Sequence, residues 1–154
     1  MDTVVPTSSA ELVSRTRRQL GERFHAASAG PVPRGRGRGT VLLGTGGAVA
    51  RAAAAISYAL VWRGKIVDPR AGRLKNLIGP ISFPAIVAAV YPDNSWYDGE
   101  PCIVLDYAKT SFVAKAVRDE IREVSPGVYL GLVFLGGKHV LDFALDFTHG
   151  RDRS

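Results

Sequence analysis

Hydrophobic and polar residues alternate with a period of two through most of the chain after residue 60. Such alternation is typical of β-strands that bury one face. Gly, Pro, Asn and Asp cluster between the alternating stretches and predict short turns. Short connections make neighbouring strands antiparallel, because a parallel crossover needs a dozen residues or more. The expected strands cover residues 61–67, 74–78, 82–91, 102–107, 117–124, 128–135 and 139–147.

The first 60 residues follow a different pattern. Ser8 and Glu11 have the spacing of a capping box, which predicts that a helix starts there and ends before Gly30. Its apolar stripe consists of Leu12, Leu20 and Phe24. Residues 33–39 alternate arginine and glycine without a core-forming side chain, so we expect an exposed basic loop. A short strand over residues 40–43 and a second helix over residues 48–60 follow.

These patterns predict an α+β fold that is mostly β. We expect an antiparallel barrel or strongly curled sheet with two N-terminal helices, because closure removes long exposed edges. The length of 154 residues and the hydrophobic fraction of 46% fit a single domain with its own core. In that domain, residues 1–39 hold the first helix and the basic loop, residues 40–60 the short strand and second helix, and residues 61–148 the barrel.

Cysteine and histidine are too sparse for the common metal sites. The single cysteine, Cys102, excludes an internal disulfide and a Cys-rich zinc site, and the three histidines are scattered. Residues 41–47 resemble part of a dinucleotide-binding turn, but Val49 takes the place of its third glycine and no further strand–helix alternation follows. We therefore expect neither a metal nor a cofactor.

The formal net charge of +6 is concentrated near the N-terminus, where residues 1–51 hold eight arginines and three acidic residues. A basic segment of this kind can bind nucleic acid or an anionic membrane, or it can be a solvated surface. Residues 25–57 contain no aromatic side chain on which a nucleobase could stack. The solvated surface is therefore preferred, and nucleic acid is disfavoured as a partner.

The sequence gives no sign of membrane insertion or secretion. No segment reaches the ~20 apolar residues that a spanning helix needs. The N-terminus lacks the basic flank and apolar stretch of a secretory signal. We expect no membrane span and a cytoplasmic location.

Carboxylates interrupt strand faces that are otherwise apolar. Asp119 lies between Val117 and Ile121 in the period-two pattern, for example. If one face lines a lumen, polar groups can converge there: Asp106, Asp119, Asp142, Asp146, Arg118, Arg122, Tyr107 and Tyr129. Such a set suits general acid–base chemistry or recognition of a polar ligand group. The alternative is pairing of Asp and Arg across a solvated face.

Three large aromatic residues complete the candidate ligand site. Trp62 begins the first long strand and is expected to pack under the second helix. Trp96 and Tyr97 lie between turn-forming residues, where their loop could close over a barrel mouth. The alternative is that both aromatic side chains plug one end of the barrel.

The segment from Trp62 to Phe147 resembles bacterial lipocalin-like proteins of the calycin type. The resemblance rests on the motifs Trp-Arg-Gly-Lys at residues 62–65, Asp-Gly-Glu-Pro at 98–101, Val-Leu-Asp-Tyr at 104–107 and Arg-Asp-Glu-Ile-Arg-Glu-Val at 118–124, and on the closing strand. The Gly-x-Trp opening strand of ordinary lipocalins is missing. The resemblance implies a barrel around an apolar ligand pocket, and some similar barrels are isomerases, cyclases or decarboxylases.

We expect the protein to bind a small, mainly apolar molecule such as a lipid or polyketide-like metabolite. In an enzymatic version without a cofactor, Asp119 or Asp106 would be the acid–base group, Arg118 or Arg122 would set its charge, and Tyr107 would orient the substrate. The alternatives are a basic nucleic-acid adaptor and a structural module. In the structural module, the apolar helix stripe would dock another chain or a second copy, which allows a homodimer.

Overall fold

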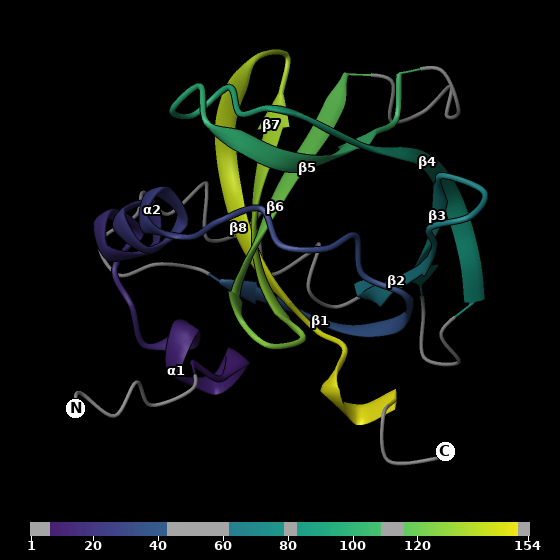
Figure 1. Ribbon diagram of the computed structural model, residues 1–154, viewed down its shortest axis with the longest axis horizontal. Coiled ribbons are helices and arrows are strands. Elements are labelled where there is room, and N and C mark those ends of the chain that lie inside the picture. The colour runs from purple at the N-terminus through teal and green to yellow at the C-terminus, as the bar shows by residue number, and fades with distance from the viewer. Residues whose placement is uncertain (1–6, 43–61, 79–82, 109–115, 151–154) are drawn as a thin grey trace.

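The computed structural model describes residues 7–42, 62–78, 83–108 and 116–150 and consists of a closed antiparallel barrel with helices packed on its outside (Figure 1). Its strands are β1 (Gly35–Leu42), β2 (Trp62–Asp68), β3 (Arg73–Ile78), β4 (Phe83–Asn94), β5 (Pro101–Asp106), β6 (Val117–Ser125), β7 (Val128–Leu135) and β8 (Lys138–Asp146). The helices are α1 (Ser9–Val13), α2 (Arg17–Ala26) and the short 3-10 helix η1 (Thr148–Gly150). The predicted fold class, mostly β with two N-terminal helices, is confirmed.

Each strand pairs with its neighbour in the chain, and β1 pairs with β8 to close the barrel. All seven strands predicted after residue 60 are present, with bounds shifted by at most three residues. Closure leaves no strand edge unpaired, as the sequence pattern indicated. The second helix predicted over residues 48–60 and the glycine turn at residues 44–47 lie outside the described residues.

The prediction that residues 33–39 form a loop is wrong, because most of them belong to β1. Gly37 and Gly39 of this strand point inward, where large rings from other parts of the chain fill the space. A Cβ atom on Gly37 would lie 2.6 Å from the Phe147 ring, and one on Gly39 would lie 2.3 Å from the Trp62 ring. Glycine in a strand marks such a close approach. The apolar packing on the inner side of β1 therefore comes from side chains outside this strand.

A β-bulge in β2 determines which of its side chains face inward. The register with β3 shifts between Trp62 and Gly64. Gly64 has a φ of +136°, and a Cβ atom there would lie 2.1 Å from the Gly37 carbonyl oxygen. Only glycine fits this position. Beyond the bulge, Lys65 and Val67 face the interior and Ile66 faces outward.

Two apolar layers lie on opposite sides of the sheet. The inner layer fills the barrel and includes Leu74, Leu105, Ile121 and Phe143. The outer layer lies between the barrel and the N-terminal helices, and it consists of Leu12, Leu20, Phe24, Leu42, Cys102, Val104, Val128, Leu130, Leu132, Phe134 and Ala144. The apolar helix stripe predicted from the sequence is therefore buried against this chain's own barrel and does not offer a docking face to another chain.

The N-terminal helix is interrupted, whereas the sequence pattern predicted one continuous helix. Ser8 caps α1 as predicted, and its Oγ accepts a hydrogen bond from the Glu11 amide. Thr16 then starts α2, because its side chain accepts from the Gln19 amide while the Gln19 side chain accepts from the Thr16 amide. This second capping box stabilises a new helix start where the pattern placed a helix interior.

We expect the substitution Thr16→Ala to lower the free energy of unfolding by about 1 kcal/mol, because it removes an N-cap hydroxyl. Thr16→Ser is the matched control, since it keeps the hydroxyl and should change stability by only a few tenths of a kcal/mol. Urea denaturation measures both values. Equal stability of the two variants would show that the cap does not hold α2.

In the described part of the chain, no helix has the length and apolarity that crossing a bilayer requires.

Candidate functional site

Among the described residues, Lys65, Asn76, Tyr107 and Asp119 form a polar cluster in the barrel interior. The Lys65 Nζ donates hydrogen bonds to Asn76 Oδ1 at 2.7 Å, to the Tyr107 hydroxyl at 2.8 Å and to Asp119 Oδ2 at 3.1 Å. All four side chains are buried, and Lys65 has no exposed surface. We call this set the interior cluster.

The remaining hydrogen bonds of the interior cluster determine which groups act as donors and which as acceptors. Asn76 Nδ2 donates to the Tyr107 hydroxyl at 2.9 Å, and Trp62 Nε1 donates to Asn76 Oδ1 at 3.2 Å. The Tyr107 hydroxyl in turn donates to Asp119 Oδ2 at 3.3 Å. Asp119 Oδ2 thus accepts hydrogen bonds from both Lys65 and Tyr107. Both bonds favour the negatively charged form of the Asp119 carboxylate.

Burial controls the proton affinities in the interior cluster. It raises the pKa of the Asp119 carboxyl, and the positive charge of Lys65 opposes that rise. Burial, followed by the nearby Asp119 charge, raises the pKa of Tyr107 well above its ordinary value. Tyr107 therefore remains a neutral hydrogen-bond donor at neutral pH. Groups with perturbed proton affinity in one buried cluster are the usual material of acid–base sites.

Aromatic rings surround the Lys65 ammonium. Its Nζ lies 5.4 Å from the ring centre of Trp62, 5.5 Å from that of Tyr107 and 5.4 Å from that of Phe143. Ring faces attract a cation most strongly where water is excluded. Inside the barrel, the Lys65 side chain is therefore surrounded by three rings and one carboxylate.

Lys65 was not among the residues singled out from the sequence. Strict alternation from Trp62 places Gly64 and Ile66 on the inner face and Lys65 on the outer face. The bulge at Gly64 reverses this assignment after Trp62. Gly64, two residues after Trp62, was the available signal for this reversal, since a glycine inside a strand often marks a bulge.

Four of the predicted site residues face the barrel interior: Trp62, Tyr107, Asp119 and Tyr129. Trp62, Tyr107 and Asp119 belong to or touch the interior cluster. Tyr129 lies nearer the barrel end where β7 begins, and its hydroxyl donates to the Pro31 carbonyl oxygen at 2.7 Å. The structure therefore brings together only part of the set that was expected to converge.

The expectation that the other charged residues point into the lumen is wrong. The residues that face outward are Asp106, Asp142, Asp146, Arg118 and Arg122. Asp106 alternates with the inward Leu105 and Tyr107, and Asp142 and Asp146 alternate with the inward Phe143 and Leu145. Because successive side chains in a strand point to opposite faces, these five cannot join Asp119 inside the barrel.

Arg122 is an outward residue with a structural role. Its side chain is completely buried under α2, and its guanidinium donates to Asp98 Oδ1 and Oδ2 at 2.7 and 2.6 Å. It also donates to the backbone carbonyls of Phe24, Glu100 and Pro101. Hydrogen bonding by Arg122 lowers the pKa of Asp98 well below its ordinary range. Arg122 therefore joins α2 and the β4–β5 turn to β6.

Arg118 and the two loop aromatics also lie outside the lumen. The Arg118 guanidinium lies 4.2 Å from the Trp96 ring centre and pairs with Glu120 at 3.0 Å. Tyr97 packs edge-on against Phe24 of α2. Trp96 packs edge-on against Phe134 of the outer layer, so both loop aromatics lie on the outside of the barrel and neither cover nor plug its mouth.

The outward carboxylates have local partners. Tyr91 donates to Asp106 at 2.7 Å, and burial together with this hydrogen bond raises the pKa of Tyr91 to about 12. Asp142 pairs with His139, and Asp146 accepts from Thr148. Among the described residues, no group of three or more His, Cys, Asp or Glu side chains could hold a metal ion.

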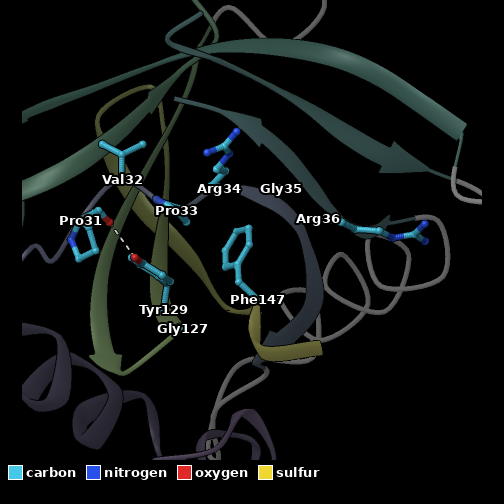
Figure 2. Close-up of a pocket in the computed structure, with 9 residues that line it drawn as sticks. All are labelled: Pro31, Val32, Pro33, Arg34, Gly35, Arg36, Gly127, Tyr129 and Phe147. Carbon is cyan, nitrogen blue, oxygen red and sulfur yellow. Dashed lines mark hydrogen bonds between the residues drawn. The ribbon is translucent and has the colours of Figure 1, made fainter. Parts of the chain in front are cut away.

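A separate cavity of about 580 Å³ opens at the end of the barrel where β1 and β7 begin and β8 ends. Residues 31–36, Gly127, Tyr129 and Phe147 line it (Figure 2). The chain from Pro31 to Gly35 runs along one side, and the rings of Tyr129 and Phe147 stand on the other. We call this the end cavity. Its size lies within the range of about 300–1,000 Å³ typical of small-molecule pockets.

Comparison with protein-family models gives no match, and comparison with curated proteins gives none either. Among solved structures, the chain is similar to a protein from Thermomonospora curvata whose crystal structure is known. The two share 20% sequence identity with a TM-score of 0.61, over 84% of this chain and 86% of the other. At this level of identity, the similarity shows a shared fold alone.

Proposed function

We propose that the protein binds a small, mainly apolar molecule in the end cavity. The observation that carries the proposal is a cavity of ligand size with apolar walls from Val32, Tyr129 and Phe147. Arg34 and Arg36 lie at its margin, so a ligand with an acidic group at one end of an apolar body fits best. Fatty acids and polyketide-like acids have this chemistry. The calycin-type resemblance of the sequence supports the same class of ligand.

A second candidate function, acid–base chemistry without a cofactor, is favoured by the interior cluster. Asp119 would exchange the proton, and Tyr107 would donate a hydrogen bond to the substrate. Lys65 would set the charge of Asp119, a role that was expected for Arg118 or Arg122 from the sequence. A buried ion pair is often less stable than apolar side chains of the same size, so its presence points to a role other than stability.

The binding proposal is tested first on the purified protein. Native mass spectrometry should detect a retained small molecule. Dodecanoic acid should also displace the fluorescent anion 1-anilinonaphthalene-8-sulfonate from the protein.

We expect Val32→Trp to weaken dodecanoate binding at least about tenfold, a loss of roughly 1.4 kcal/mol, because the larger ring occupies the end cavity. Leu135→Trp is the matched control. Leu135 is 51% exposed at the other end of β7, so this variant should bind as the native protein does. Equal affinities for the two variants, or no bound molecule and no displacement in the native protein, would refute the proposal.

A further inference from the structure

Basic side chains that the sequence did not place together gather on the outward surface of β1, β2 and β3, at the residue before β1 and in the β2–β3 turn. All are exposed: Arg34, Arg36, Arg38, Arg63, Arg70, Arg73 and Lys75. We call this surface the basic face. In Figure 1, β2 and β3 lie on the side of the barrel away from α2. Most of the net positive charge of the sequence lies in residues 1–51, and the barrel joins the arginines of that segment to basic residues from β2 and β3.

Strand register brings these side chains close together. Arg36 pairs with Ile66 of β2, and Ile66 pairs with Lys75 of β3. Neighbouring strands are about 4.8 Å apart, so Arg36 and Lys75 lie roughly 10 Å apart on either side of Ile66. Arg38 follows Arg36 on the same face of β1 at a distance of about 7 Å. The basic face is thus a continuous surface across three strands.

The part of the chain that the structure describes balances the positive charge of the basic face only in part. Asp68 lies opposite Arg73 in the register of β2 and β3, and Asp146 of β8 lies opposite Arg38 and interacts with its charge. Two carboxylates thus face seven basic side chains. None of the seven forms an ion pair with a described carboxylate. Asp68 is the only acidic residue on β1, β2 or β3, and its Oδ1 accepts from the backbone amides of Arg70 and Ala71. The arginines near the helices, in contrast, have partners, such as Arg15 with Glu11 and Arg18 with Glu22.

The basic face also contains a recess of about 470 Å³ between β1 and the start of β2. Arg36, Arg38 and Arg63 line it together with the backbone of Gly39. Guanidinium groups bind phosphate through two parallel hydrogen bonds, and they do so better than ammonium groups. Three arginines at one recess therefore favour a phosphate group as the ligand.

We propose that the basic face binds double-stranded nucleic acid through its phosphate backbone. Six of the seven basic side chains are arginine, and successive outward residues on a strand are about 7 Å apart, close to the axial spacing of every second phosphate in a duplex strand. Ile66 is the one exposed large apolar residue among the described residues of the basic face. Single strands need aromatic side chains for stacking, and membranes need apolar anchors, so a duplex fits this face better than either.

Fluorescence anisotropy with a labelled duplex of about 20 base pairs tests the proposal. Binding should be independent of sequence, and its affinity should fall steeply as salt rises from about 50 to 200 mM. With four to six phosphates neutralised, the slope of log K against log salt should be about −4 to −5.

Two double variants with the same change in net charge separate the basic face from general charge. We expect Arg38→Glu with Lys75→Glu to weaken duplex binding by roughly a hundredfold, since two favourable contacts become repulsive. Arg15→Glu with Arg18→Glu changes the helices instead and should weaken binding much less. Equal losses in both double variants, no binding at about 50 mM salt, or tighter binding to vesicles of anionic phospholipid than to the duplex would each overturn the proposal.

The same variants separate this inference from the proposed ligand site. Arg38 and Lys75 do not line the end cavity. Dodecanoic acid should therefore displace 1-anilinonaphthalene-8-sulfonate from the double variant Arg38→Glu with Lys75→Glu as it does from the native protein. Its melting temperature, followed by circular dichroism, establishes that it is folded. Loss of duplex binding with retained dodecanoate binding supports the basic face independently of the end cavity.

Discussion

Replacing Lys65 by methionine is expected to lower the free energy of unfolding by roughly 3–5 kcal/mol, because Asp119 is left buried without its cation. The loss also removes hydrogen bonds to Asn76 and Tyr107. Urea denaturation measures the change. Lys75→Met is the control, since this neighbouring lysine is exposed and the substitution should alter stability by less than about 0.5 kcal/mol.

The double variant Lys65→Met with Asp119→Leu carries the more informative expectation. Both buried charges are then absent, and we expect stability to return to the native value or to exceed it by about 1–4 kcal/mol. Such a result would mean that the ion pair is not maintained for stability, which favours the acid–base role of the interior cluster. A double variant as unstable as Lys65→Met alone would show that the pair holds the barrel together, and the case for chemistry would be lost.

The second large effect is expected at Arg122. The substitution Arg122→Met should lower the free energy of unfolding by about 3–5 kcal/mol, because Asp98 and three backbone carbonyls lose their buried donor. Urea denaturation again gives the value. Arg18→Met is the matched control, since its side chain is 90% exposed and its pairing with Glu22 contributes little. Similar stability of the two variants would contradict the structural role of Arg122.

The pH dependence of stability gives an independent measure of the contact between Arg122 and Asp98. Arg122 holds the pKa of folded Asp98 below the ordinary value of 3.8. A lowered pKa in the folded state stabilises the protein above the unfolded value, and this contribution disappears as the pH falls from about 4 toward the folded value. Native stability should therefore decrease more steeply below pH 4 than that of Arg122→Met. Parallel pH profiles for the two proteins would show that Asp98 does not depend on Arg122.

The strands could be predicted from sequence because their signals are local. Alternating residues such as Leu141, Phe143 and Leu145 have a period of two whatever surrounds them, and turns rich in glycine and proline separate the strands. The same local reasoning failed at Thr16. Thr16 lies inside the single helix that the pattern predicted, but it caps a second helix, because Gln19 completes its capping box.

The candidate site was predicted only in part because the direction of a side chain depends on its neighbours in three dimensions. Tyr107 and Asp119 were identified from the sequence, and they do face the interior. Asp106 and Asp142 carry the same chemistry but lie on the outward face of their strands. The sequence does not show which face of each strand is inside. It therefore could not distinguish Tyr107 and Asp119 from Asp106 and Asp142.

By itself, the sequence determined the antiparallel strands, their order and the cap at Ser8, because hydrophobic period, turn residues and capping residues act over a few positions. Tertiary structure alone decided that the Arg-Gly segment is a strand, that Lys65 is buried beside Asp119, and that the arginines of β1 join those of β2 and β3. These features depend on rings, a bulge and strand register contributed by distant parts of the chain. Such contacts exist only once the barrel has closed.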